Sequence, residues 1–203
     1  PGIVGIISKK SRDLNEHNLR IMINCMMHEP TYNSGSYLND QLGVYVGWVC
    51  HRDSFADGMP VFNEQKDMVL IFSGENFPDH KLEEDLKRQG HEFNPSRASS
   101  LIHLYEEEGD DFLRHLNGWF RGLLMDLRKR ITILFNDRYG LGRIYYYENT
   151  EGFYFSSEAK SLLKILPELR KLDFISLGEM FSCGCVLQNR TLFPSIYMLP
   201  GGS

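Results

Sequence analysis

The chain has 203 residues, of which 42% are apolar and 24% charged, close to the averages for globular domains. Its formal net charge of −5, from 22 basic and 27 acidic residues, argues against a general nucleic-acid binder or a protein that docks on anionic membranes. No apolar stretch reaches the roughly 18 residues of a membrane span, and no charged-then-apolar leader is present. We therefore expect one cytoplasmic domain over residues 1–203, with neither nucleic acid nor membrane as a partner.

The first part of the chain predicts a mixture of strands and helices. Short apolar runs rich in β-branched residues favour strands, at Pro1–Ile7, Leu42–Cys50 and Met68–Phe72. Helical spacing of apolar residues favours helices at Asn15–Met27, Lys81–Gln89 and Ser99–Glu108, followed by a helical turn at Asp110–Leu116. Pro, Asn, Gly and Ser predict loops at Glu29–Tyr37 and Ser73–Asn76.

The second part begins with four short strands at about 10-residue spacing, typical of a β-meander. They are expected at Trp119–Asp126, Ile131–Asn136, Ile144–Tyr147 and Phe153–Ser156. A helix at Ser157–Leu166, a helical turn at Leu177–Phe181 and a strand pair around Val186 and Leu192 follow. Several strands are apolar on consecutive residues and need cover on both faces. The pattern predicts an α+β fold with two stacked antiparallel sheets and helices outside.

The cysteines and histidines show no pattern typical of a metal site. Cys183 and Cys185 form a C-x-C pair, but no second pair completes four ligands, and Cys25 and Cys50 stand alone. We interpret all four as free thiols. The seven histidines are scattered without the spacing of a helical metal pair, so no metal ligand is predicted.

Six ordered strings resemble class II glutamine amidotransferases, and in particular the glutaminase domain of asparagine synthetases. Gly2–Ile6 is similar to the start of that domain, and Ser73–Glu75 resembles its N-G-E string. The others are Leu116–Phe120 (L-N-G-M-F), Asn136–Gly140 (R-D-R-F-G), Phe155–Leu163 (F-A-S-E-I-K-A-L-L) and Leu199–Gly201 (L-P-P-G). The resemblance covers the whole chain and implies a four-layer αββα sandwich, the N-terminal-nucleophile hydrolase fold.

The resemblance also implies a catalytic arrangement that this chain alters. In the family an N-terminal Cys attacks the amide of glutamine, and its own amine acts as the base. Pro1 occupies that position and offers neither thiol nor hydroxyl. The oxyanion-hole Asn corresponds to Ser73, whereas Gly74, whose N–H could still face a carbonyl, is retained.

The substrate-binding positions are altered as well. The family's Asp that holds the ammonium of glutamine corresponds to Arg97, which reverses the charge. The family's carboxylate-binding Arg has only Arg52 as a nearby candidate, and an exposed loop Arg is an equal alternative. Glu75 is retained. The nucleophile, the oxyanion donor and the ammonium ligand have thus changed together.

The resemblance leads us to expect an asparagine synthetase-like pseudoenzyme domain without glutaminase activity. It would act as a scaffold for an ATP-dependent, amide-forming ligase domain in the same chain, in asparagine biosynthesis. No cofactor is expected here, and ATP and magnesium belong to the C-terminal domain. A homodimer is compatible with the sequence. The alternatives are an active glutaminase in which residue 1 is altered, and a pocket repurposed for an anionic small molecule around Arg97.

Overall fold

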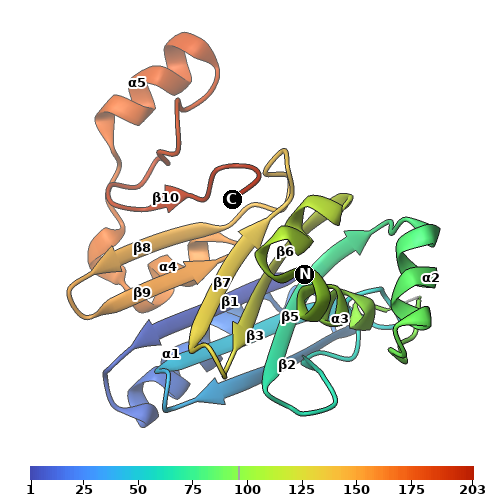
Figure 1. Cartoon of the computed structure of the whole chain (residues 1–203). Coiled ribbons are helices and arrows are strands. Elements are labelled where there is room, and N and C mark those ends of the chain that lie inside the picture. Colours follow the sequence, from blue (N-terminus) through green and yellow to red (C-terminus); the bar gives the residue numbers. More distant parts are fainter. Residues whose placement is uncertain (96) are drawn as a thin grey trace.

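Two antiparallel sheets lie face to face in the computed structural model, which describes residues 1–95 and 97–203 (Figure 1). The six-stranded sheet has the order β10 (Tyr197–Met198), β8 (Tyr145–Asn149), β9 (Gly152–Ser156), β1 (Gly2–Ser8), β3 (Val44–His51) and β2 (Tyr32–Asn39). The four-stranded sheet has the order β4 (Val61–Phe62), β5 (Met68–Asn76), β6 (Gly118–Asp126) and β7 (Ile131–Asn136). Strand β1 therefore lies inside its sheet, between β3 and β9.

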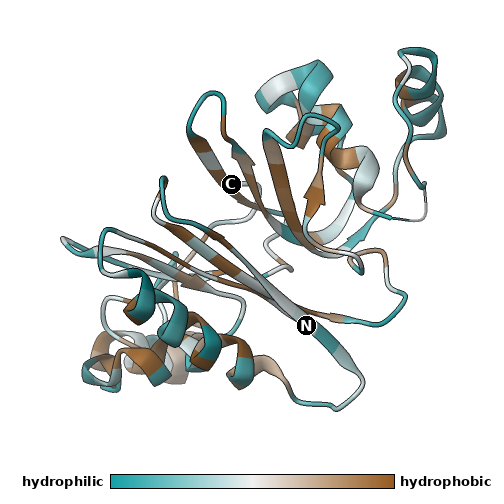
Figure 2. Ribbon diagram, turned by 90° about the horizontal axis from the view of Figure 1, so that it is seen from below, coloured by the Kyte–Doolittle hydropathy of each residue, from teal (hydrophilic) through white to brown (hydrophobic). Residues whose placement is uncertain are grey.

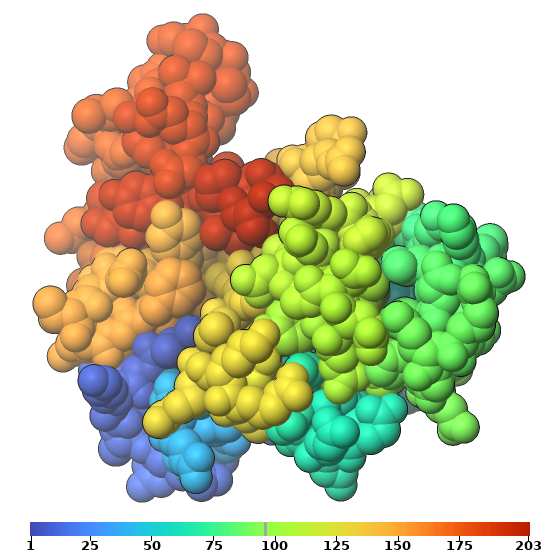
Figure 3. Space-filling model, viewed as in Figure 1, coloured from blue at the N-terminus to red at the C-terminus, as the bar shows by residue number. Residues whose placement is uncertain are grey.

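Helices cover the outer face of each sheet. On the six-stranded sheet these are α1 (Arg12–Met26) and α4 (Ala159–Ile165). On the other sheet α3 (Ser99–Glu108) and the 3₁₀ helix η1 (Gly109–His115) pack together, with α2 (His80–Arg88) beside them. After the short η2 (Pro167–Leu169), α5 (Phe174–Cys183) extends away from the body (Figures 1 and 3). The predicted α+β sandwich of four layers is confirmed.

The apolar side chains of β1 are buried on both faces of its sheet. Ile3 belongs to the apolar core between the two sheets, together with Ile71 of β5, which lies on the same face of its strand as Ser73. Val4 and Ile6 point the other way, into a second core that includes Met22 of α1. The alternation follows from the two-residue repeat of a strand. Figure 2 shows the resulting apolar band along the strands and the polar outer faces of the helices.

Two segments expected as loops belong to strands. Glu29–Tyr37 was predicted as a loop, but β2 begins at Tyr32 and pairs with β3 along its whole length. β2 is the edge strand of the sheet, and the backbone groups that face β3 are satisfied by that pairing although the segment is polar. Likewise Ser73–Asn76 continues β5, and each of these residues has a partner on β6. The loop predictions are wrong for Tyr32–Tyr37 and Ser73–Asn76, because cross-strand pairing outweighs the local turn propensity, whereas Glu29–Thr31 lies outside the strands as predicted.

The C-terminal part also differs from the sequence prediction. The four strands form two hairpins, β6–β7 and β8–β9, which lie in different sheets, so they are not one meander. The predicted helical turn at Leu177–Phe181 is part of the longer α5. Instead of a strand pair around Val186 and Leu192, the structure has β10 and a bridge between Arg190 and Tyr197. No helix of the described residues is long and apolar enough to cross a bilayer.

Candidate functional site

Pro1 lies at the start of β1, where the two sheets approach each other. The β1–β3 register pairs Gly2 with Val49, which places Pro1 beside Cys50. Across the gap between the sheets, Nη2 of Arg121 on β6 donates a hydrogen bond of 3.0 Å to the Pro1 carbonyl. Arg121 thus ties the beginning of β1 to the facing sheet.

Ser73 lies on the same face of that facing sheet as Arg121. The two residues are direct partners in the β5–β6 ladder, and directly opposed residues project to the same side of a sheet. Because Arg121 reaches Pro1, the Ser73 side chain also faces the β1 side. Only 2% of Ser73 is exposed to solvent. The structure therefore brings Pro1, Ser73 and Arg121 together.

Gly74 is held in a conformation that only glycine tolerates easily. Its φ is +119°, and a Cβ would lie 2.2 Å from the carbonyl oxygen of Trp119 and 2.8 Å from Cα of Phe120. Both contacts are backbone atoms of β6, so they cannot rotate away. The close approach of two backbones explains the glycine without any reference to catalysis. Glu75, which follows, is half-buried.

Arg97 is neutralised by acidic neighbours. Its Nη1 donates to the Ser54 carbonyl at 2.9 Å and lies 3.6 Å from Oδ2 of Asp57, while Nη2 lies 3.8 Å from Asp53. A hollow of about 370 Å³ is lined by Arg97 and Asp57 together with Gly58, Val61, Asn94 and Ser99. The surroundings of Arg97 thus carry both signs of charge, which the sequence alignment with the family does not reveal.

Asp57 connects Arg97 to the start of β1. It accepts hydrogen bonds from the backbone N–H groups of Asp53 (2.8 Å) and Gly58 (2.9 Å). The first of these bonds is the main cause of its lowered pKa. On its other side, Oδ1 lies 3.9 Å from Sγ of Cys50, the neighbour of Pro1. Arg52, by contrast, is exposed in the turn after β3.

Cys50 lies beside Pro1, but its thiol is not activated. Burial, followed by the negative charge of Asp57, raises the pKa of the Cys50 thiol to about 11. With that pKa, only about one molecule in 10⁴ carries the thiolate at pH 7. Cys50 is therefore a protonated, buried thiol beside Pro1.

A second charged group lies on the α4 side of Pro1. Glu158 contacts Nε2 of His28 at 2.9 Å and Nζ of Lys160 at 2.8 Å. Burial raises the pKa of Glu158, but these two partners outweigh it and hold the pKa below its usual value. Burial and then the charge of Arg121 lower the pKa of the Pro1 amine, and Glu158 acts in the opposite direction. The sequence analysis did not identify these residues.

Residues of the family-like strings around this site make hydrogen bonds that hold the backbone in place. Oγ of Ser157 accepts the N–H of Ile3 at 2.8 Å and donates to the Ile3 carbonyl at 3.1 Å, which fixes the start of β1. In the string Asn136–Gly140, the buried carboxylate of Asp137 accepts the backbone N–H groups of Tyr139 (3.0 Å) and Leu141 (3.1 Å). Asp137 thereby organises the turn after β7.

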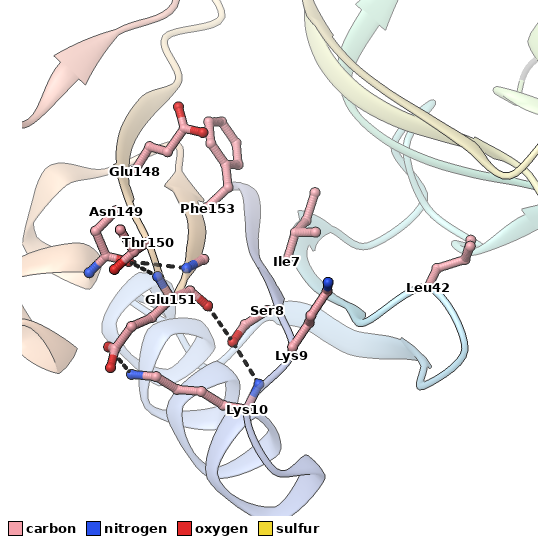
Figure 4. Close-up of a pocket in the computed structure, with 11 residues that line it drawn as sticks. Ile7, Ser8, Lys9, Lys10, Leu42, Glu148, Asn149, Thr150, Glu151 and Phe153 are labelled. Atoms are coloured by element: carbon pink, nitrogen blue, oxygen red, sulfur yellow. Dashed lines mark hydrogen bonds and ion pairs between the residues drawn. The ribbon is translucent and has the colours of Figure 1, made fainter.

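A hollow of about 540 Å³ lies at the opposite end of β1 (Figure 4). Lys10 and Glu151 on its wall pair with each other, and Oγ of Ser8 donates to the Glu151 carbonyl at 3.1 Å. Six strand residues separate this end from Pro1, or about 20 Å. The hollow is thus distinct from the group around Pro1.

Comparison with protein families matches residues 1–203 to the family described as the glutamine amidotransferase domain. The chain belongs to this family. Asparagine synthetase [glutamine-hydrolyzing] 1 of Bacillus subtilis is 26% identical over 209 aligned residues, which cover all of this chain and 32% of that protein. The asparagine synthetase of Zea mays is 32% identical over 132 residues, covering 58% of this chain and 22% of that protein. The chain thus spans about a third or less of these relatives.

Solved structures show the same fold. Glutamine phosphoribosylpyrophosphate amidotransferase from B. subtilis superposes with a TM-score of 0.62 at 15% identity, covering 81% of this chain and 43% of that one. The allosteric regulatory enzyme of purine biosynthesis gives a TM-score of 0.60 at 16% identity, covering 82% and 43%. These likenesses confirm the N-terminal-nucleophile hydrolase fold expected from the sequence.

Proposed function

We propose that residues 1–203 form a single glutamine amidotransferase-type domain that has lost glutaminase activity and serves as a scaffold for an ATP-dependent amide-forming domain of the same protein. Pro1 at the start of β1 carries the proposal, because it supplies no nucleophile at the family's position. Losing the nucleophile costs about 10⁶ in rate in well-studied hydrolases. The nearby Cys50 does not replace it, since burial keeps its thiol protonated.

Further support comes from the groups around Pro1. Arg121 donates to the Pro1 carbonyl at 3.0 Å. Ser73 stands where the family has the oxyanion Asn, and its hydroxyl is shorter than an amide side chain. Arg97 stands where the family holds an ammonium group. Its pairing with Asp57 weakens the alternative of an anion-binding pocket, because an anion would meet a carboxylate beside the guanidinium.

The scaffold role is supported by α5. Phe174 and Phe181 on this helix are 81% and 83% exposed, and Ile175 is 66% exposed. Figure 3 shows the helix in a lobe that stands out from the body. The matched asparagine synthetases are several times longer than this chain, so a further domain has the length to cover this apolar surface. ATP and magnesium would bind in that domain.

Ammonia release from glutamine by the full-length protein tests the loss of activity. We expect no release above background and no label at residue 1 from a diazo-ketone glutamine analogue. Pro1→Cys alone should remain inactive, whereas adding Ser73→Asn and Arg97→Asp should restore glutamine binding before turnover. Arg114→Asp, a charge reversal at an exposed site, is the matched control for Arg97→Asp. Robust ammonia release by the unaltered protein would refute the proposal, and near-family activity of Pro1→Cys alone would favour the active alternative.

The scaffold role has its own test. Phe181→Asp should weaken amide formation by the full-length protein and increase protease cleavage between the domains. Leu14→Asp, at an exposed apolar residue of α1, is the matched control and should change neither. Equal behaviour of the two variants would show that α5 does not hold the second domain.

A further inference from the structure

Two histidines and a glutamate meet beyond the start of β5. His103 on α3 is 4% exposed, His91 follows α2, and Glu64 lies in the loop before β5. One ligand atom from each residue lies within 4.8 Å of the other two. Nε2 of His103 lies 3.9 Å from Oε1 of Glu64. The three side chains converge although they come from separate segments.

Neighbouring carboxylates orient both imidazole rings. Nδ1 of His103 lies 2.9 Å from Oε2 of Glu106, and Nε2 of His91 lies 2.9 Å from Oε1 of Glu107. In the tautomer with the proton on the nitrogen nearest each carboxylate, Nε2 of His103 and Nδ1 of His91 carry the lone pairs, and Nδ1 of His91 also lies 3.9 Å from Oε2 of Glu106. Glu106 is fixed in turn by Nδ2 of Asn63 at 2.8 Å. A carboxylate behind each histidine is the usual second layer of a metal site.

We propose that Glu64, His91 and His103 bind a zinc ion, with water at a fourth position. Tetrahedral zinc with bonds of about 2.0–2.1 Å needs ligand atoms about 3.3 Å apart. The 3.9 Å gap between His103 and Glu64 therefore has to close by about 0.6 Å, and the other gaps by at most about 1.5 Å. The Glu64 side chain is 58% exposed and has room to move toward the histidines. The rings of His91 and His103 lie with their centroids 4.6 Å apart, so the gap between their nitrogens has to close by rotation of the rings. Two imidazoles and one carboxylate suit zinc rather than magnesium or calcium.

The zinc site is separate from the group around Pro1. Oδ1 of Asn63, the residue before Glu64, accepts the N–H of Met68 at 3.0 Å, so the site lies at the first residue of β5. Ser73 is five strand residues further on, or about 17 Å away. The ion would join α3 and the segment after α2 to the loop that leads into β5. Its role is therefore structural and independent of the proposed loss of glutaminase activity.

Zinc binding to the full-length protein tests this proposal. The background is Cys183→Ser with Cys185→Ser, because these exposed thiols could also take zinc. The apoprotein is titrated with Zn²⁺ against a chelating indicator, and Co²⁺ binding is followed by its visible absorption. We expect the parent to bind one equivalent more than Glu64→Ala or His91→Asn, and the parent melting temperature to rise with Zn²⁺.

Matched variants separate the site from unspecific binding. Glu106→Gln should weaken zinc affinity about 10- to 100-fold, as loss of an orienting carboxylate does in other zinc proteins. His80→Asn, whose side chain is 96% exposed, should bind zinc like the parent. Since Glu64 is exposed, Glu64→Ala should fold normally, which its far-UV circular dichroism will show. Equal stoichiometry and affinity in the parent, Glu64→Ala and His91→Asn would overturn the proposal.

Discussion

Replacing Gly74 by alanine is expected to destabilise the fold much more than the same change at Gly58. Both glycines have positive φ, +119° and +92°, so both substitutions strain the backbone. At Gly74 the new Cβ would lie 2.2 Å from the Trp119 carbonyl oxygen, whereas at Gly58 nothing lies within 4 Å. The difference in destabilisation between Gly74→Ala and Gly58→Ala therefore measures the cost of the close approach of β5 and β6, separately from the backbone strain.

The magnitude follows from the displacement that Gly74→Ala requires. Ordinary contact begins at 3.4 Å, so the end of β6 must move by 1.2 Å (3.4 − 2.2). Losing about two ladder hydrogen bonds costs roughly 2 kcal/mol, and the strained φ adds about 1–3 kcal/mol. The total is about 3–5 kcal/mol, against about 1–3 kcal/mol for strain alone at Gly58. In a chain of this size the difference of about 2 kcal/mol corresponds to a melting temperature lower by roughly 4–8 °C.

Urea unfolding of the 203-residue chain, followed by circular dichroism, measures the two free energies. Equal destabilisation by the two substitutions would refute the reasoning, because it would mean that β6 moves aside without cost. The result also bears on function. If Gly74 is required by backbone packing, its retention in the family-like string Ser73–Glu75 says nothing about an oxyanion hole.

Two further predictions concern buried carboxylates. Asp137→Ala should lower the free energy of unfolding by about 2–5 kcal/mol, because the N–H groups of Tyr139 and Leu141 lose their acceptor. Asp137→Asn keeps an acceptor oxygen and should be less destabilised. Equal urea midpoints of the two variants would contradict this account. Burial acts to raise the pKa of Asp126, but hydrogen bonding from Lys129 and nearby cations outweigh it and hold the pKa below 3.8. Its contribution to stability is therefore present above about pH 4 and lost as the pH falls through the lowered value. Acid unfolding should be shallower in Asp126→Asn than in the parent, and superimposable acid curves would exclude the effect.

The charge of Arg97 illustrates the limit of reasoning from aligned positions. The sequence predicts a reversal of sign where the family holds an ammonium group, and that role is still a prediction. The structure adds that Asp57 lies 3.6 Å from the guanidinium, although 40 residues separate them in the chain. A charge can be assigned from one residue, but an electrostatic potential depends on every neighbour in space.

The zinc ligands show the same limit for a site that a motif search cannot find. His91 and His103 are 12 residues apart, and Glu64 precedes His91 by 27. The three residues are too far apart in the sequence to form a short metal-binding motif. They meet because α3 packs beside α2 and the loop before β5 passes the same end of the sheet.

The sequence by itself determined the fold family and most of the strands and helices. Buried strands such as β1 are apolar on successive residues, and in helices such as α3 apolar residues recur every three to four residues. Both patterns are local, so they can be recognised in the sequence. Only the tertiary structure decided that β2 is a strand, because polar Ser34–Ser36 form one only through pairing with β3. It also decided which side chains surround Pro1, since Cys50, Arg121 and Glu158 come from three elements distant in the chain. Pairing and proximity across sheets depend on packing, which no local pattern encodes.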